Sequence, residues 1–244
     1  MIGNWEITLQ EIAGNPNLTF IYFIGFVLIG VLGVRFGLYA LWNRRASQLP
    51  SQASIWTHLT GVGGTASLYG VVGVLGIITP AMPAIRRTVL LAFVFLLALT
   101  MRLIARQGTP ADDGADEDGF LRQPTVLGLS LVVVAVLFAE LAGLEERLIV
   151  GLAGIGGVTF AGYGYWHGRT QLSRSMVQGT MLDTLLRHLL PVLAFGAFVP
   201  AVELVVLAGI DRAIVLHVQI VFVIMTATAL MTANIKLRQN LARL

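Results

Sequence analysis

The sequence predicts an all-α integral membrane protein, a seven-helix bundle that crosses the bilayer several times. Two observations predict this class: the chain is strongly apolar, and its apolar residues are gathered into runs long enough to span a membrane. Of the 244 residues, 56% are hydrophobic and only 12% are charged, whereas a typical soluble domain carries about 25% charged residues. Because each span takes about 20 apolar residues, we expect residues 1–244 to form a single transmembrane domain.

Each predicted span is a near-continuous apolar run, which indicates a helix. Strands of a membrane barrel would instead alternate apolar and polar residues over about ten positions. A helix also satisfies its backbone hydrogen bonds internally, as lipid requires. The predicted spans are 18–42, 56–78, 88–104, 125–144, 148–166, 185–208 and 213–235.

The distribution of basic residues predicts the orientation, because short cytoplasmic loops accumulate Lys and Arg. Ten of the sixteen basic residues follow spans one, three, five and seven, whereas the other side holds only Arg86, Arg87, Arg147 and Arg212. We therefore expect the N-terminus outside and the C-terminus inside. The predicted location is the cell membrane, as a multi-pass protein of a prokaryotic plasma membrane in contact with the lipid bilayer.

One predicted cytoplasmic loop, residues 107–124, is strongly acidic. Its segment 111–119 reads Ala-Asp-Asp-Gly-Ala-Asp-Glu-Asp-Gly, which is too charged to bury. We interpret it as a solvated loop, with a docking segment or a cation site as alternatives. Together with fifteen arginines against one lysine, this loop resembles proteins of salt-loving archaea and predicts a halophile as the source.

Two glycine-rich segments resemble each other. Residues 59–64 read Leu-Thr-Gly-Val-Gly-Gly in span two, and residues 152–157 read Leu-Ala-Gly-Ile-Gly-Gly in span five. Glycines inside spans favour close helix packing. A repeat of three plus three helices with an extra seventh is a second interpretation, since transporter folds often carry such symmetry. It predicts, as an alternative function, a small ion or solute channel or transporter.

Ionisable residues within spans are the best candidates for a functional site, because a charge near the bilayer centre is costly and usually faces the bundle interior. Glu140, Glu203 and His217 lie in the outer parts of spans four, six and seven. Spans six and seven are joined by a short turn, so Glu203 and His217 fall at similar depth. If they face each other, they form a proton-sensitive pair or an outer ligand site; the alternative is that they reach water at the interface.

A second polar set lies toward the predicted inner side and comprises Arg35, His58, Arg102 and His188. Two histidines at matched depth can ligate a b-type haem, which gives a b-type cytochrome subunit as one alternative. Interfacial histidines without a ligand are the other interpretation. We predict no metal site.

The sequence lacks the motifs of several enzyme classes. It contains no cysteine, which excludes thiol catalysis and thiolate metal sites. The serine-hydrolase, zinc-protease and P-loop motifs are also missing, so we expect no enzyme and no catalytic residues. The basic residues are dispersed rather than gathered on one face, which indicates no nucleic-acid partner.

Spans six and seven carry a resemblance to the microbial rhodopsins. The stretch Leu-Arg-His-Leu-Leu-Pro-Val-Leu at 186–193, running on to Gly209, resembles their sixth helix, and Ile-Lys-Leu-Arg at 235–238 resembles the close of their seventh. The resemblance implies a seven-helix scaffold with its N-terminus outside. In that family a lysine near the middle of the seventh helix binds retinal as a Schiff base.

The residues that would bind retinal do not carry over. The position of the retinal lysine is Ala229, and the chain's one lysine, Lys236, lies about 10 Å of helix rise beyond it. The counterion position of the seventh helix falls on Met225, and that of the third helix falls on Leu90 if Arg87 is the matching arginine. We therefore expect no Schiff-base retinal; any other cofactor is unknown.

These observations lead to one functional hypothesis with alternatives. The sequence favours a non-enzymatic membrane protein on an opsin-like scaffold, serving as a binding, sensory or accessory subunit. The alternatives are the channel or transporter, a membrane anchor, and the b-type cytochrome subunit. A protein partner or a homo-oligomer is compatible with each of them.

Overall fold

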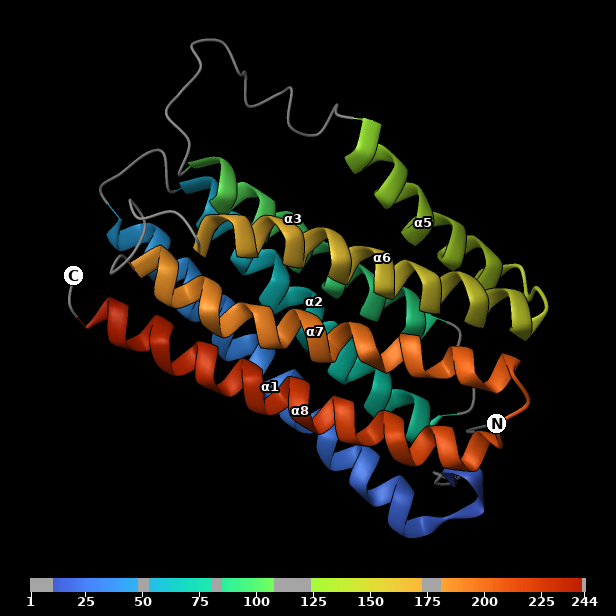
Figure 1. The fold of residues 1–244 in the computed structure, drawn as a ribbon. Coiled ribbons are helices and arrows are strands. Elements are labelled where there is room, and N and C mark those ends of the chain that lie inside the picture. Colours follow the sequence, from blue (N-terminus) through green and yellow to red (C-terminus); the bar gives the residue numbers. More distant parts are fainter. Residues whose placement is uncertain (1–10, 48–52, 80–84, 108–123, 173–180, 243–244) are drawn as a thin grey trace, which may run out of the picture.

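The computed structural model describes residues 11–47, 53–79, 85–107, 124–172 and 181–242. A short 3-10 helix, η1 (Ile12–Gly14), precedes seven helices that are each long and apolar enough to cross a membrane (Figure 1). In these ranges the predicted all-α class and seven helices long and apolar enough to span a membrane are confirmed, whereas the acidic loop lies almost wholly outside the described residues. The helices are α1 (Pro16–Ala46), α2 (Ala53–Ile78), α3 (Arg86–Gln107), α5 (Pro124–Leu141), α6 (Glu146–Leu172), α7 (Met181–Leu207) and α8 (Arg212–Leu241).

Two glycines in the left-handed conformation follow α5 and α7. The sequence predicts that the fourth span continues to residue 144, whereas α5 ends at Leu141. Gly143 has a φ of 63°, and Gly209 has a φ of 87°. Glycine adopts this conformation without steric cost and commonly ends helices. The amide of Leu144 donates to the carbonyl of Ala139 at 3.0 Å, which closes the last turn of α5.

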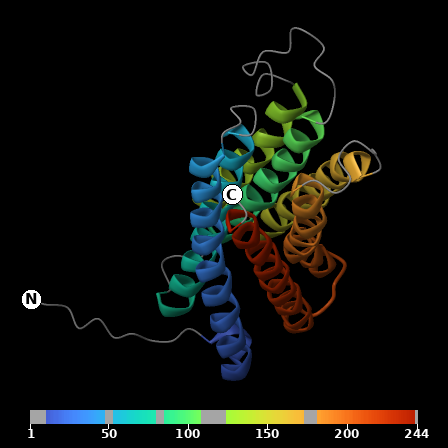
Figure 2. The same ribbon diagram turned by 90° about the vertical axis from the view of Figure 1, so that its left-hand side faces the viewer.

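The helices form a closed bundle with α3 at its centre. α1 packs against both α2 and α8, so the first and last spans are neighbours, and α3 packs against α2, α5, α6 and α7 (Figure 2). Of the most apolar stretch of α3, 72% is buried inside the protein, compared with 28% for α5. α5 is therefore a peripheral helix that contacts mainly α3 and α6.

Glycines bring α1 and α2 into backbone contact. A Cβ atom added at Gly33 would lie 2.5 Å from the amide nitrogen of Ser67, and one at Gly70 would lie 2.5 Å from that of Gly30. Only glycine fits at such positions. In lipid, where burial of apolar side chains gives no net drive for association, this close packing holds helices together. Gly64, in contrast, has no neighbour within 4 Å of an added Cβ.

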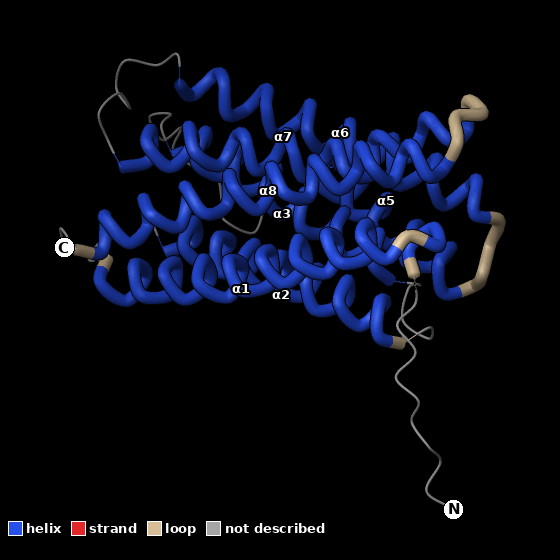
Figure 3. Tube along the Cα trace, turned by 90° about the horizontal axis from the view of Figure 1, so that it is seen from below, coloured by secondary structure: helices blue, strands red, loops and turns tan. Residues whose placement is uncertain are grey.

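α1 and α8 run in the same direction and end together (Figure 3). Near their starts, the Tyr22 hydroxyl lies 3.0 Å from Gln219 Oε1, and near their ends Asn240 Nδ2 donates to Asn43 Oδ1 at 2.6 Å. The outer surface of the bundle carries large apolar side chains, which is what lipid contact requires. Among the most exposed are Phe20, Leu131, Phe138, Leu141 and Trp166.

Candidate functional site

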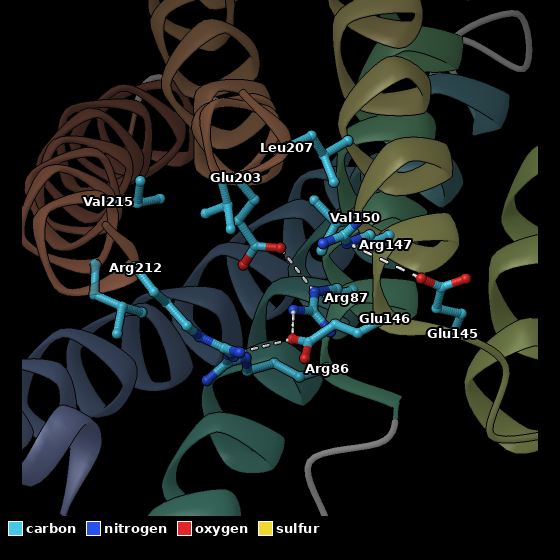
Figure 4. Close-up of a pocket in the computed structure, with 12 residues that line it drawn as sticks. Arg86, Arg87, Glu145, Glu146, Arg147, Val150, Glu203, Leu207, Arg212 and Val215 are labelled. Atoms are coloured by element: carbon cyan, nitrogen blue, oxygen red, sulfur yellow. Dashed lines mark hydrogen bonds and ion pairs between the residues drawn. The ribbon is translucent and has the colours of Figure 1, made fainter. Parts of the chain in front are cut away.

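A charged pocket of about 350 Å³ opens at the end of the bundle where α3, α6 and α8 begin and α7 ends (Figure 4). In the predicted orientation this is the outer end. Four arginines and three glutamates contribute to its wall, against a background of apolar residues from α6, α7 and α8. The charged residues are Arg86, Arg87, Glu145, Glu146, Arg147, Glu203 and Arg212.

Arg87 is the centre of the ion-pair network in this pocket. Its Nε donates to Glu203 Oε2 at 2.7 Å, and its Nη2 donates to Glu146 Oε1 at 3.2 Å. Arg212 Nη1 lies 2.9 Å from the same Glu146 oxygen. One carboxylate oxygen is therefore shared by two guanidinium groups, and the network joins α3, α6, α7 and α8. Charge-assisted bonds of this kind are stronger than neutral ones.

The network continues inward from Glu203 to α1. Glu203 Oε1 accepts a hydrogen bond from Gln219 Nε2 at 2.7 Å, and this amide also contacts the Val199 carbonyl at 3.1 Å. The Tyr22 hydroxyl lies 2.8 Å from the Leu216 carbonyl and 3.0 Å from Gln219 Oε1, either of which can accept its one hydrogen. These buried polar groups are satisfied by one another, as burial requires.

Small residues of α6 let α7 bring Glu203 into this position. A Cβ atom at Gly154 would collide with the side chain of Leu204, and one at Gly157 would lie 2.8 Å from Pro200 Cγ. Leu204 and Pro200 flank Glu203 along α7. The glycine-rich segment of α6 therefore sets how closely α7 approaches, and with it the position of the buried carboxylate.

Glu140 approaches the start of α3 from α5, next to Arg87. Its Oε2 accepts hydrogen bonds from Thr88 Oγ1 at 2.6 Å and from the Thr88 amide at 3.3 Å. The first amides of a helix lack partners within the helix and favour a negative charge, so Glu140 stabilises the N-terminus of α3. Its Oε1 is buried and has no hydrogen-bond partner among the described residues.

The structure does not pair Glu203 with His217, the first of the two interpretations of their similar depth. Glu203 bonds to Arg87 and Gln219 instead, while His217 is exposed and its Nδ1 lies 2.7 Å from the Ala213 carbonyl of its own helix. Similar depth does not place two residues on facing sides. Gln219 follows His217 by two residues, which is about 200° around a helix, and it is Gln219 that faces Glu203.

The two histidines of the inner set each contact their own helix. His58 Nδ1 lies 2.9 Å from the Ser54 carbonyl, and His188 Nδ1 lies 2.6 Å from the Thr184 carbonyl. Within the described ranges, no group of three or more His, Cys, Asp or Glu residues is arranged to hold a metal ion.

The two arginines of the inner set lie in different surroundings. Arg102 is buried in α3, and its guanidinium carbon lies 5.9 Å from the centre of the Tyr163 ring. Arg35 is exposed on α1 and its Nη2 donates to the Tyr39 hydroxyl at 3.3 Å. The two arginines thus contact different tyrosines, Tyr163 on α6 and Tyr39 on α1.

Sequence reasoning missed most of the residues that complete the outer network. In sequence, Arg87 and Arg212 report orientation, and Arg87 serves besides only as a possible match to a rhodopsin arginine; Gln219 and Tyr22 carry no prediction. Gln219 is an uncharged polar residue within a long apolar run. Because buried polar groups need partners, that position alone predicts a hydrogen-bond partner for Gln219 inside the bundle. The partner itself depends on helix rotation, which one sequence does not reveal.

No model of a known protein family matches the sequence, and no curated protein or solved structure matches it significantly. The functional argument therefore rests on the geometry of the pocket.

Proposed function

We propose that this chain is a non-enzymatic binding or sensory subunit that takes a small anionic molecule, such as a carboxylate or phosphate, into the pocket at the start of α3. The predicted orientation puts this pocket on the outer face of the membrane. A volume of about 350 Å³ lies at the lower end of the range for small-molecule sites.

The observation that carries this proposal is the state of Arg86. It borders both the charged pocket and a neighbouring pocket of about 330 Å³ that contains residues of η1. Its described contact is with the ring of Phe26, 5.8 Å from the guanidinium carbon, and the described residues place no carboxylate within 4.0 Å of it. The other arginines, Arg87, Arg147 and Arg212, already contact glutamates. Arg86 is thus a cation available to an anion from outside.

The ion pairs and hydrogen bonds behind the pocket connect a bound anion to several helices, so binding can change how those helices pack. An anion near Arg86 would compete with Glu146 for Arg87 and Arg212, and Arg87 also holds Glu203. Through Gln219 and Tyr22 that carboxylate is joined to α8 and α1. A ligand that binds one arrangement of these pairs better than another shifts the population of helix arrangements, which is what a sensory subunit requires.

The distribution of polar groups favours binding over transport. Buried carboxylates and amides lie toward the ends of the helices, and the buried threonines between them, Thr100 and Thr226, donate to carbonyls of their own helices. The central part of α3 contributes apolar core residues such as Phe93 and Leu97. A channel or transporter needs polar groups along its path, and the described residues gather them at the ends instead.

The opsin-like scaffold remains a prediction and is compatible with this proposal. Its support is the number of helices and the contact between α1 and α8 that closes the bundle. Ala229, the position expected for a retinal lysine, is buried in α8. An absorption spectrum of the purified protein after addition of retinal tests the expectation that no Schiff base forms at Ala229: a visible band reducible by borohydride would contradict that expectation.

Thermal unfolding with added anions tests the proposed function. We expect millimolar citrate, glutamate or inorganic phosphate to raise the midpoint in detergent, with choline and glucose as ineffective controls. Arg86→Gln should abolish the shift, whereas Arg44→Gln, an exposed arginine at the opposite end of the bundle, should retain it. The proposal fails if no anion stabilises the protein or if Arg86→Gln responds like the wild type.

A further inference from the structure

A groove lined by two arginines lies between α1 and α8, at the end of the bundle opposite the charged pocket. It has a volume of about 360 Å³, and its wall includes Leu32, Arg35 and Tyr39 from α1 and Asn234 and Arg238 from α8. Residues 32, 35 and 39 fall on one face of α1, and residues 234 and 238 fall on one face of α8. The groove therefore follows the seam between two parallel helices and opens on the surface of the bundle.

The seam is held together by amide side chains, so the groove exists without a ligand. Asn234 Nδ2 donates to the Leu32 carbonyl at 3.0 Å, across from α8 to α1. One to two turns further along, Asn43 Nδ2 donates to the Leu237 carbonyl at 3.2 Å and Asn43 Oδ1 accepts from Asn240 at 2.6 Å. These cross-helix bonds fix the spacing of the two walls.

The described lining of the groove is basic. Arg35 and Arg238 are both exposed, and among the described residues no Asp or Glu borders the groove and no ion pair includes either arginine. Arg35 rests against Tyr39, with its guanidinium carbon 5.9 Å from the ring centre. A charge on the outside of a membrane-spanning segment is costly, and the described residues give Arg35 no carboxylate partner, so an anion at the lipid surface would stabilise it.

Each arginine ends a stripe of exposed apolar side chains. On α8, Ile224, Met231 and Ile235 are 40 to 53% exposed and lie on the same side of the helix as Arg238. On α1, Ile24, Leu28 and Val31 are 41 to 54% exposed and lie on the same side of the helix as Arg35. Each helix thus presents an arginine next to a row of exposed apolar side chains. This arrangement is complementary to an amphiphile that has an anionic headgroup and acyl chains.

Asn234 adds a second polar feature. It borders the groove and is 4% exposed, yet its Oδ1 has no hydrogen-bond donor in the part of the chain that the structure describes. A headgroup that carries hydroxyls supplies donors to this wall, whereas a fully ionised phosphate supplies none.

We propose that the α1–α8 groove binds the headgroup of an anionic glycerophospholipid, with the phosphodiester between Arg35 and Arg238 and the acyl chains along the two apolar stripes. Basic pockets between membrane helices are suited to such headgroups. Neither arginine belongs to the charged pocket at the other end of the bundle, so this inference is independent of the proposed function.

Native mass spectrometry of the full chain in detergent tests the proposal, with dioleoyl phosphatidylglycerol as the ligand and dioleoyl phosphatidylcholine as the zwitterionic control. We expect one phosphatidylglycerol to be retained in preference to phosphatidylcholine. Replacing Arg35 or Arg238 by Gln should weaken retention about fivefold each, and about 25-fold together. The matched control, Arg44→Gln with Arg45→Gln, removes two exposed arginines of α1 that do not border the groove and should bind as the wild type does.

Three results would overturn the proposal. Equal retention of the two lipids would show that the groove does not select an anion. An equal loss in the Arg44/Arg45 control would show that the attraction is general charge rather than a site. Displacement of phosphatidylglycerol by millimolar inorganic phosphate would show a small-anion site instead of a lipid site. Intrinsic tryptophan fluorescence during thermal unfolding checks that each variant is folded.

Discussion

The pair of Arg87 and Glu203 should carry a large share of the stability at the start of α3. The two side chains are 18% and 9% exposed, and 2.7 Å separates Arg87 Nε from Glu203 Oε2. Removing one partner of a buried pair leaves an uncompensated charge, which costs about 3–5 kcal/mol. We take the lower end, about 3 kcal/mol, because Glu146 still contacts Arg87 when Glu203 is changed and Gln219 still contacts Glu203 when Arg87 is changed.

A double-mutant cycle measures the pair directly. We expect Glu203→Gln and Arg87→Gln each to lower the free energy of unfolding by about 3 kcal/mol. The double variant should lose less than the sum by about 2 kcal/mol, because it removes both charges together. The control Arg147→Gln changes an arginine that is 84% exposed and 4.0 Å from Glu145, and should stay within about 0.5 kcal/mol of the wild type.

The assay is equilibrium unfolding in mixed micelles with increasing dodecyl sulfate, followed by tryptophan fluorescence and by far-ultraviolet circular dichroism. The protein has four tryptophans and no cysteine, so intrinsic fluorescence is preferable to thiol-reactive dyes. Additive losses in the double variant would refute the reasoning, because they would mean that the two groups do not interact. Losses below about 1 kcal/mol in both single variants would show that the pair is solvated.

Three further predictions concern packing, helix capping and anion binding, and a fourth concerns orientation. Gly63→Val should block the approach of α1 and prevent folding or lower the midpoint of thermal unfolding by many degrees, whereas Gly64→Val, which faces open space, should leave that midpoint unchanged. Thr88→Val should cost about 1.5–3 kcal/mol by removing a hydrogen bond to a carboxylate, compared with little for the exposed Thr228→Val; equal losses would contradict the capping role. Glu146→Gln should strengthen citrate binding by about fivefold in isothermal titration calorimetry, since it removes a competing carboxylate worth about 1 kcal/mol. A reporter enzyme active only outside the cell should be inactive when fused to the C-terminus, and activity there would reverse the predicted orientation.

The fold could be predicted from the sequence because a single physical constraint dominates it. In lipid each apolar run of about 20 residues must be a helix, so hydropathy alone located all seven spans to within a few residues at most ends. The largest departures are at the ends of α6 and α8, which each extend six residues beyond the predicted limits of 166 and 235 as polar helical segments that hydropathy does not detect.

The candidate site could be predicted only in part. Glu140 and Glu203 were identified because carboxylates inside apolar spans are costly, and both prove to be buried. Their partners were not identified, because the rotation of each helix decides which residues face one another. His217 and Gln219 differ by two positions, yet only Gln219 faces Glu203. Arg87 was hidden for another reason: at a helix end, a charge that marks topology and a charge that builds a site look the same in sequence.

The shared oxygen of Glu146 connects the stability of the pocket to its proposed function. Because Arg87 and Arg212 both contact this oxygen, Glu146 holds two cations close together that would otherwise repel each other. An incoming anion can take over that role, since it offers the same charge to the same groups. The Glu146 side chain is 53% exposed, so water can solvate it when an anion displaces it from the two arginines. The buried Glu203, in contrast, keeps its bond to Arg87. The bound anion should therefore replace the Glu146 carboxylate and leave Glu203 paired with Arg87. For this reason Glu146→Gln is expected to raise the affinity for anions, whereas Arg86→Gln is expected to lower it.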